Sequence, residues 1–261
     1  MAVERLYESE NFLVVNKPFD MYINSEDKKE KNTVTYHVAS PDSHLSSSMF
    51  PLHFVQRLDY ATSGVLCIAK NKLFAARAGK LFEKRDTMKF YLAVVRGHVT
   101  FEVADIEFNV GMDTTTLDSS HQMTALTSSE SLAKCVQSRN AHTRALRLET
   151  GYYENSPATV LLLKPITGRR HQLRVHCNAV GHTILGDYTY SGKKDSTPHR
   201  MFLHATRCFQ RLSNAHYHHR CIENRTVLPL LKIENCLCYL SQKSPWTSRR
   251  MNHSSQTLDS A

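Results

Sequence analysis

The loop at residues 56–64 gathers side chains that could do chemistry next to a buried element. Arg57 and Asp59 stand two positions apart, two hydroxyl side chains follow, and residues 65–69 form an uninterrupted apolar run. Such a run predicts a buried strand, and a polar loop held by a strand is a common position for catalytic groups. The same residue types also make turns and structural ion pairs, so composition alone leaves both interpretations open.

A second polar stretch, residues 165–176, holds three arginines and two histidines. Thr167 can cap a helix that Gly181 would end in the left-handed conformation. Arg170 and Arg174 stand one helical turn apart and are expected on one face of that helix. These cations could bind a phosphate, pair with a buried carboxylate, or form a solvated basic face.

The elements that hold these two stretches are predicted from apolar patterns. Asn71 can cap a helix over about residues 72–85, whose apolar side chains recur at helical spacing. The segment from Thr33 to Ala39 fits a short helix or a strand. Short apolar runs predict buried strands at residues 12–15, 65–69, 88–97 and 160–163, the first of which ends before Pro18.

The string Arg57-Leu58-Asp59, followed by Thr62-Ser63-Gly64, resembles the central motif of the RluA family of pseudouridine synthases, in which the aspartate is the catalytic residue. Six fixed positions at roughly one in twenty each make a chance match in 261 residues on the order of 10⁻⁵ or rarer. Further strings are similar to family patterns: Asn16-Lys17-Pro18, Lys89-x-Tyr91-x-Ala93, Thr167-Gly168-Arg169-x-His171-Gln172-Leu173-Arg174, Gly186-Asp187 and residues 201–205. The resemblance covers roughly residues 5–235.

Two departures from the family pattern stand beside these strings. Gln56 occupies the position before the motif arginine, where the family usually has histidine. Phe19-Asp20 follows Pro18, where the family usually continues with glycine, and this departure is similar to an animal subgroup of the family. Because Gln56 is not at the nucleophile position, we expect activity to survive, with a change in RNA choice or rate.

The resemblance implies an α+β fold with a single pseudouridine synthase catalytic domain at residues 1–240. Its central sheet would be mixed and mostly antiparallel, flanked by helices and split by a basic catalytic cleft. Residues 241–261 are polar with few apolar side chains, which predicts a disordered tail. Residues 105–135 are the least informative, and they fit an insertion or a long RNA-facing loop.

The resemblance also implies roles for side chains in the cleft. Asp59 would be the nucleophile or the base, and Arg174 would pair with it and keep it ionised in a dry cleft. Tyr91 would stack on the uracil, with its phenol where the C5 proton must be removed. Leu203 would pack near the base. Arg57 would enter the stack that the uridine vacates when it flips out.

The expected partner is RNA, either ribosomal or transfer RNA. The formal net charge of +9 favours a polyanion. The basic side chains Lys17, Arg169, Arg170 and His171 are expected to bind that RNA. Pseudouridine formation consumes no water, metal or redox agent, so we expect neither a metal nor a small-molecule cofactor. A monomer is expected.

Cysteine usage and hydropathy indicate where the chain works. Seven cysteines, an odd number in a chain too long for a small disulfide scaffold, suit a reducing compartment. The expected location is the cytoplasm, with nuclear entry left open. No run approaches 18 apolar residues, so no membrane span is expected. The first ten residues have no apolar signal region, and their three glutamates argue against a mitochondrial transit peptide.

Two other functions stay open. One is an RNA-binding protein of the same fold that has lost catalysis, against which the presence of Asp59, Tyr91 and Arg174 argues. The other is a zinc protein, because cysteines and histidines gather loosely near the C-terminus: Cys208, His216, His218, His219, Cys221, Cys236 and Cys238. They include no Cys-x-x-Cys pair and fit no common zinc finger, so a structural or solvated role is favoured.

Overall fold

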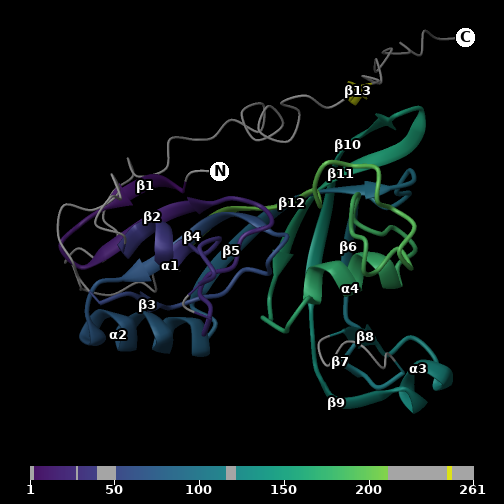
Figure 1. Ribbon diagram of the computed structural model, residues 1–261. Coiled ribbons are helices and arrows are strands. Elements are labelled where there is room, and N and C mark those ends of the chain that lie inside the picture. Colours follow the sequence, from purple (N-terminus) through teal and green to yellow (C-terminus); the bar gives the residue numbers. More distant parts are fainter. Residues whose placement is uncertain (1–2, 28, 40–50, 116–121, 211–245, 249–261) are drawn as a thin grey trace, which may run out of the picture.

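The structure, a computed structural model, describes residues 3–27, 29–39, 51–115, 122–210 and 246–248. One mixed sheet of ten strands dominates this part of the chain (Figure 1). Its main path runs β1 (Glu4–Glu8), β2 (Phe12–Lys17), β4 (Ser63–Ala69), β12 (Leu203–Gln210), β5 (Thr87–Arg96), β11 (Ser156–Pro165), β10 (Thr143–Tyr153) and β13 (Trp246–Ser248). Two strands pair off this path, β3 (His53–Phe54) with β4 and β6 (Val103–Ile106) with β10.

The helices of the described residues divide between the two halves of this sheet (Figure 1). The helices α1 (Val34–Ala39) and α2 (Lys72–Glu83) lie on the side of β2 and β4, whereas α4 (Gln172–Ala179) packs against β10 and β11. A small sheet of β8 (Met123–Ala125), β7 (Val110–Asp113) and β9 (Cys135–Arg139), together with α3 (Ser129–Ala133), lies beside α4. The small sheet occupies much of the stretch at residues 105–135 that sequence patterns left undefined.

The two halves of the sheet meet where β4 and β12 run parallel, over the pairs Ser63–His204 and Gly64–Ala205. The other strand pairs described in the main sheet are antiparallel. Gly64 has a φ of +114°, and a Cβ at this position would lie 2.2 Å from the carbonyl oxygen of Ala205. A side chain therefore does not fit at this position. The loop that carries Asp59 ends at Gly64, where its backbone packs closely against that of β12.

Apolar side chains pack both halves. One cluster joins β5, β11 and α4 and includes Leu163 and Leu203. The other joins β2, β4 and α1 and includes Leu13 and Leu66. Burying each such leucine contributes about 2 kcal/mol. Tyr91 of β5 packs against both clusters, so it stands where the two halves meet.

The sheet and its flanking helices confirm the predicted α+β fold. The side chain of Asn71 caps α2 as predicted, accepting a hydrogen bond of 3.0 Å from the N–H of Phe74. β2 ends at the residue before Pro18, also as predicted, and the segment after Thr33 is helical. In the part of the chain that the structure describes, no helix is long and apolar enough to cross a membrane.

The predicted domain boundary at residue 240 stays a prediction. Of the predicted tail, 241–261, the structure describes Trp246–Ser248, which pairs with Gly151–Tyr153 of β10. The rest of that tail lies outside the described residues. The cysteines and histidines that could have bound zinc also lie outside them, apart from the backbone of Cys208 in β12.

Candidate active-site cleft

A cleft of about 850 Å³ is lined by both halves of the fold. Most of its lining comes from three segments: the loop before β4 (residues 54–62), the passage from α2 into β5 (residues 82–91), and the loop before α4 with the start of that helix (residues 165–174). Of the nine site residues predicted from the sequence, all but Lys17 line this cleft. The sequence motifs therefore converge on one place.

A buried lysine fastens the loop that presents Asp59 to the cleft. Lys17, at the end of β2, is fully buried and donates from Nζ to the carbonyl oxygens of Pro18 (2.9 Å), Met21 (2.7 Å) and Tyr60 (2.9 Å). Burial lowers the pKa of Lys17 to about 7, against the opposing effect of the Asp59 carboxylate. Lys17 thus lies beneath the loop, and its predicted contact with RNA finds no support in the structure.

Each carboxylate oxygen of Asp59 faces a nitrogen from the segment around the start of α4. Arg174 Nη1 lies 3.7 Å from Oδ2, and His171 Nε2 lies 3.9 Å from Oδ1. The side chain of Asp59 is 27% exposed and that of Arg174 is 8% exposed. The carboxylate is therefore accessible from the cleft while the guanidinium beside it is not. The structure brings the expected pair of Asp59 and Arg174 together, without a direct hydrogen bond between them.

The closer partner of Arg174 is Asp187, which sequence reasoning did not single out as a site residue. Arg174 Nε and Nη2 donate to the two oxygens of Asp187 over 2.7 and 2.8 Å, and this carboxylate is fully buried. Burial opposes the charged form of Arg174, but the hydrogen bonds and charge of Asp187 outweigh it and raise the pKa of the guanidinium. A bidentate pair fixes the guanidinium plane, so Asp187 aims Nη1 at Asp59. The signal in the sequence was the Gly186-Asp187 string, to which no role was attached.

His171 stands directly before α4 in a left-handed conformation, with a φ of 52°. Its Nδ1 lies 2.9 Å from the hydroxyl oxygen of Tyr190, which also accepts a hydrogen bond of 3.0 Å from the N–H of Met123. Burial lowers the pKa of His171 to about 4, although the charge of Asp59 opposes this effect. The imidazole is therefore neutral at neutral pH. No sequence pattern pointed to Tyr190, which follows His171 by 19 residues.

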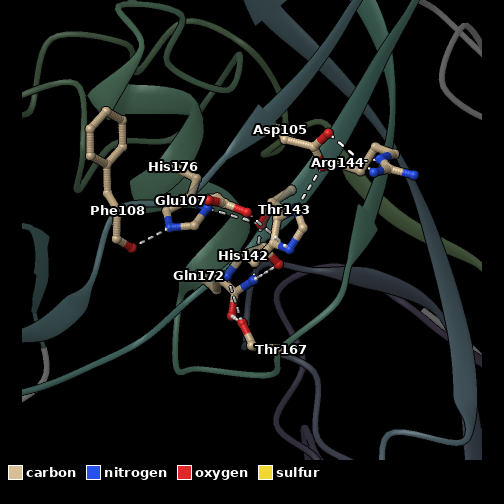
Figure 2. A network of polar contacts seen from close by, with 9 residues as sticks. All are labelled: Asp105, Glu107, Phe108, His142, Thr143, Arg144, Thr167, Gln172 and His176. Carbon is tan, nitrogen blue, oxygen red and sulfur yellow. Dashed lines mark hydrogen bonds and ion pairs between the residues drawn. The ribbon is translucent and has the colours of Figure 1, made fainter.

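A network of hydrogen bonds ties the loop before α4 to β10 (Figure 2). Its centre is the buried amide of Gln172. The Gln172 Oε1 accepts from the hydroxyl of Thr167 (2.7 Å) and from the N–H of Arg169 (2.9 Å). Its Nε2 donates to the carbonyl of His142 and to the hydroxyl of Thr143, both at 2.9 Å. An amide with all four hydrogen bonds made is a rigid anchor, and it holds the loop from which His171 reaches Asp59.

Thr167 does not cap the helix, contrary to the prediction. The helix α4 begins at Gln172 with His171 as its N-cap residue. The Thr167 hydroxyl is already engaged, since it accepts from the N–H of His142 over 2.9 Å and donates to Gln172. The predicted end of the helix is confirmed, because Gly181 follows α4 in the left-handed conformation, with a φ of 82°.

The shared helix face predicted for Arg170 and Arg174 is also corrected. Arg170 precedes α4 and is exposed, whereas Arg174 lies within the helix and is buried. Both nevertheless line the cleft. The reason is the late start of the helix, which places Arg170 on the loop and leaves only Arg174 in the helical repeat.

Tyr91 and Leu203 reach the cleft from neighbouring strands, β5 and β12. Leu203 is buried, and Tyr91 is partly buried against both apolar clusters. They give the cleft an apolar wall on which a flat ring can pack. Their predicted contacts with the target base stay predictions.

Three arginines from separate elements form a group that we call the arginine cluster. They are Arg85 after α2, Arg139 at the end of β9 and Arg169 in the loop before α4; Arg85 and Arg169 line the cleft. Arg169 Nε donates to the carbonyl of Asn140 over 2.9 Å, and burial together with the charges of the other two arginines lowers its pKa. Within the described ranges none of the three pairs with a carboxylate, whereas Arg96, outside the cleft, does. Unpaired like charges held close together suit a polyanionic ligand.

Comparison with known proteins places these features in a family. The family model described as RNA pseudouridylate synthase matches residues 11–179. The zebrafish RNA pseudouridylate synthase domain-containing protein 1 is 42% identical over 202 residues, covering 77% of this chain and 67% of the relative. The human protein of that name is 39% identical over 217 residues, covering 78% and 66%. The dual-specificity RNA pseudouridine synthase RluA of Vibrio vulnificus is 32% identical over 203 residues, covering 77% and 75%.

Solved structures give the same picture. The structure of human RNA pseudouridylate synthase domain containing 1 matches with a TM-score of 0.66 at 34% identity, covering 82% of this chain and 83% of that chain. Human RNA pseudouridylate synthase domain containing 4 matches with a TM-score of 0.58 at 22% identity, covering 78% and 83%, which shows the fold alone. The chain spans about two thirds of the length of the zebrafish and human curated relatives. The animal relatives confirm the subgroup to which the residues after Pro18 pointed.

Proposed function

The chain belongs to the RNA pseudouridylate synthase family, whose RluA-type members are isomerases, and on this basis we propose that it converts specific uridines of structured RNA into pseudouridine. One observation carries the proposal: the carboxylate of Asp59 is accessible in the cleft, with Arg174 at one oxygen and His171 at the other. Beside it lie an apolar wall that suits a base and an arginine cluster that suits phosphates.

The reaction breaks the bond between C1′ and N1 of uracil, turns the ring, and forms a bond between C1′ and C5, from which a proton leaves while N1 takes up a proton. Asp59 either adds to C1′ or removes a proton from the sugar. Tyr91 packs on the uracil and places its phenol where the C5 proton departs. Arg174, held by Asp187, orients the carboxylate. Because one substrate yields one isomeric product, neither an oxidant nor a second substrate is needed.

The target base must leave its stack, because Asp59 lies inside a cleft that a base paired in a helix does not enter. Arg57 is exposed at the cleft, where its planar guanidinium can take the vacated place in the stack. The arginine cluster holds the phosphates of the adjoining strand. Contacts of this kind position the RNA without reading its sequence.

Activity is tested by incubating the purified chain with total RNA and measuring pseudouridine by mass spectrometry of the digested nucleosides. We expect product with the wild type and with Asp27→Asn, which changes an exposed aspartate outside the cleft. We expect at least a thousandfold lower rate with Asp59→Asn, because the amide is neither a nucleophile nor a base. A wild type that binds RNA and yields no pseudouridine on any RNA would instead establish an inactive RNA-binding protein.

Ribosomal or transfer RNA is the proposed substrate class. The yeast tRNA pseudouridine(31) synthase is 30% identical over 208 residues, covering 75% of this chain and 48% of the relative, and the Vibrio relative is called dual-specificity. Mapping pseudouridines in the total RNA of cells with and without the chain identifies the target. We further propose that the chain acts as a monomer in the cytoplasm, and the free thiols of Cys67, Cys135 and Cys177 support a reducing compartment.

A further inference from the structure

The hydroxyl of Tyr190 is held between two nitrogens. Its oxygen accepts a hydrogen bond of 3.0 Å from the N–H of Met123 in β8 and lies 2.9 Å from Nδ1 of His171. Tyr190 is buried, and the guanidinium carbon of Arg174 lies 4.9 Å from the centre of its ring. The hydroxyl group has little freedom to move, because Met123 and His171 contact its oxygen and Arg174 packs on the ring.

The single proton of that hydroxyl decides which nitrogen of His171 is protonated. The N–H of Met123 already occupies one lone pair of the oxygen, and Nδ1 is the acceptor within hydrogen-bond distance in the described part of the chain. If Nδ1 carried a proton, two N–H groups would face one oxygen and the buried hydroxyl would lack an acceptor. The hydroxyl therefore donates to Nδ1, and the neutral imidazole carries its proton on Nε2.

The Nε2–H faces the carboxylate of Asp59. Nε2 lies 3.9 Å from Oδ1, while Arg174 Nη1 takes the side of the other oxygen, Oδ2. A shift of about 1 Å brings Nε2 to hydrogen-bond distance, and catalytic contacts commonly tighten in this way when substrate binds. The left-handed backbone of His171 costs about 1 kcal/mol in a non-glycine residue. Such strain is typical of positions that function keeps in place.

We propose that Tyr190 fixes the Nε2–H tautomer of His171, and that His171 thereby orients one oxygen of Asp59 as a positioning residue. A neutral donor holds the carboxylate without adding a second cation, so Oδ1 is directed without being locked in an ion pair. The proposal deepens the proposed function and rests on it for its catalytic consequence. It replaces the role in RNA binding that the sequence suggested for His171.

The tautomer is tested directly on the full chain by ¹⁵N NMR of labelled histidine at neutral pH. We expect the His171 ring to carry its proton on Nε2 in the wild type and in Tyr188→Phe, an exposed control. In Tyr190→Phe we expect a mixture of tautomers. A wild-type ring protonated on Nδ1, or on both nitrogens, overturns the proposal. This measurement needs no catalytic activity, so its outcome is independent of whether the proposed function holds.

Kinetics test the consequence. We expect His171→Leu to lower the single-turnover rate of pseudouridine formation roughly tenfold to a hundredfold, the effect of one hydrogen bond to a charged group, with RNA affinity within twofold of wild type. His171→Gln restores most of the rate, because its amide can donate from the place of Nε2. His98→Leu, which changes an exposed histidine outside the cleft, serves as the matched control. A loss of RNA affinity with an unchanged rate contradicts the positioning role and returns His171 to RNA binding.

Discussion

Replacing Asp187, the buried carboxylate that pairs with Arg174, tests whether this pair directs Arg174 toward Asp59. In Asp187→Asn the amide keeps the size of the side chain but accepts at a single oxygen and carries no charge. Among the residues that the structure describes, the carboxylate that then remains beside Arg174 is that of Asp59, 3.7 Å from Nη1. We expect the guanidinium to turn and pair directly with Asp59, which would engage the carboxylate that the reaction needs.

The magnitude follows from the distances. At an effective dielectric constant of about 20, unit charges attract by about 4.5 kcal/mol at the present 3.7 Å and by about 5.9 kcal/mol at a direct contact of about 2.8 Å. The difference of about 1.4 kcal/mol must be overcome to free Asp59, and it corresponds to a rate about tenfold lower. Losing one partner of a buried pair also lowers the free energy of unfolding by about 3 kcal/mol.

Single-turnover pseudouridine formation at saturating enzyme measures the rate, and urea denaturation measures the stability. The matched control is Asp195→Asn, which breaks the bidentate pair with Arg96 outside the cleft. The control is expected to lose stability and keep its rate. If Asp187→Asn also loses stability while its rate stays within twofold of wild type, then Asp187 supports the fold alone and the aiming argument is wrong.

Three further predictions follow from other contacts. Changing all three arginines of the arginine cluster to glutamine is expected to weaken RNA binding. In filter-binding titrations, the slope of log affinity against log salt concentration is expected to fall by about 0.7 per arginine. The control variant Arg77→Gln is expected to keep the wild-type slope. Lys17→Met leaves three carbonyl oxygens without their donor and is expected to lower the free energy of unfolding by about 3 kcal/mol; a urea midpoint equal to wild type would show that Lys17 does not fasten the loop. Burial lowers the pKa of His171 and of His204 to about 4 from 6.5, so both stay neutral in the folded chain while the unfolded chain takes up protons below pH 6.5. The free energy of unfolding is therefore expected to fall by about 2 kcal/mol for each of these two histidines between pH 7 and pH 5. In urea titrations at the two pH values, His204→Asn is expected to remove the contribution of one histidine, which is about half of their combined fall.

Four strands of the main sheet, β2, β4, β5 and β11, were predictable because local apolar patterns decide them, whereas the short strands of the small sheet were not. Every residue of β4 is buried, and a continuous apolar run in the sequence predicts a strand that is buried on both faces. The cap of α2 was predictable for a similar reason, since Asn71 bonds to a backbone group three residues away. Thr167 also has a side-chain oxygen that can cap a helix, but it does not cap α4. Its hydroxyl is taken by His142 and Gln172, and His142 lies directly before β10, a strand that no local pattern connects to Thr167.

The candidate site was predicted in outline and corrected in its contacts. The motif around Asp59 was sufficient to name the carboxylate, and the resemblance of residues 167–174 to a second family string named its neighbour on α4. Lys17 was expected to bind RNA, because the sequence does not reveal that three carbonyl oxygens converge on its side chain. Asp187 and Tyr190 went unassigned because their partners, Arg174 on α4 and His171 directly before it, lie 13 and 19 residues earlier and meet them only in the folded chain.

The two-residue junction between β4 and β12 also determines when the site can exist during translation. Ser63 and His204 stand 141 positions apart, so the first residues of β4 have no partner on that edge until the last part of the catalytic domain has left the ribosome, while β3 pairs with Ile68 and Ala69 at the other end of the strand. Contacts of such long sequence separation form slowly, and an unpaired apolar strand is exposed to aggregation meanwhile. A product that ends before residue 200 would retain Asp59, Tyr91 and Arg174 in its sequence. It would nevertheless lack the strand against which Gly64 closes the loop, so it is expected to be inactive and prone to aggregate.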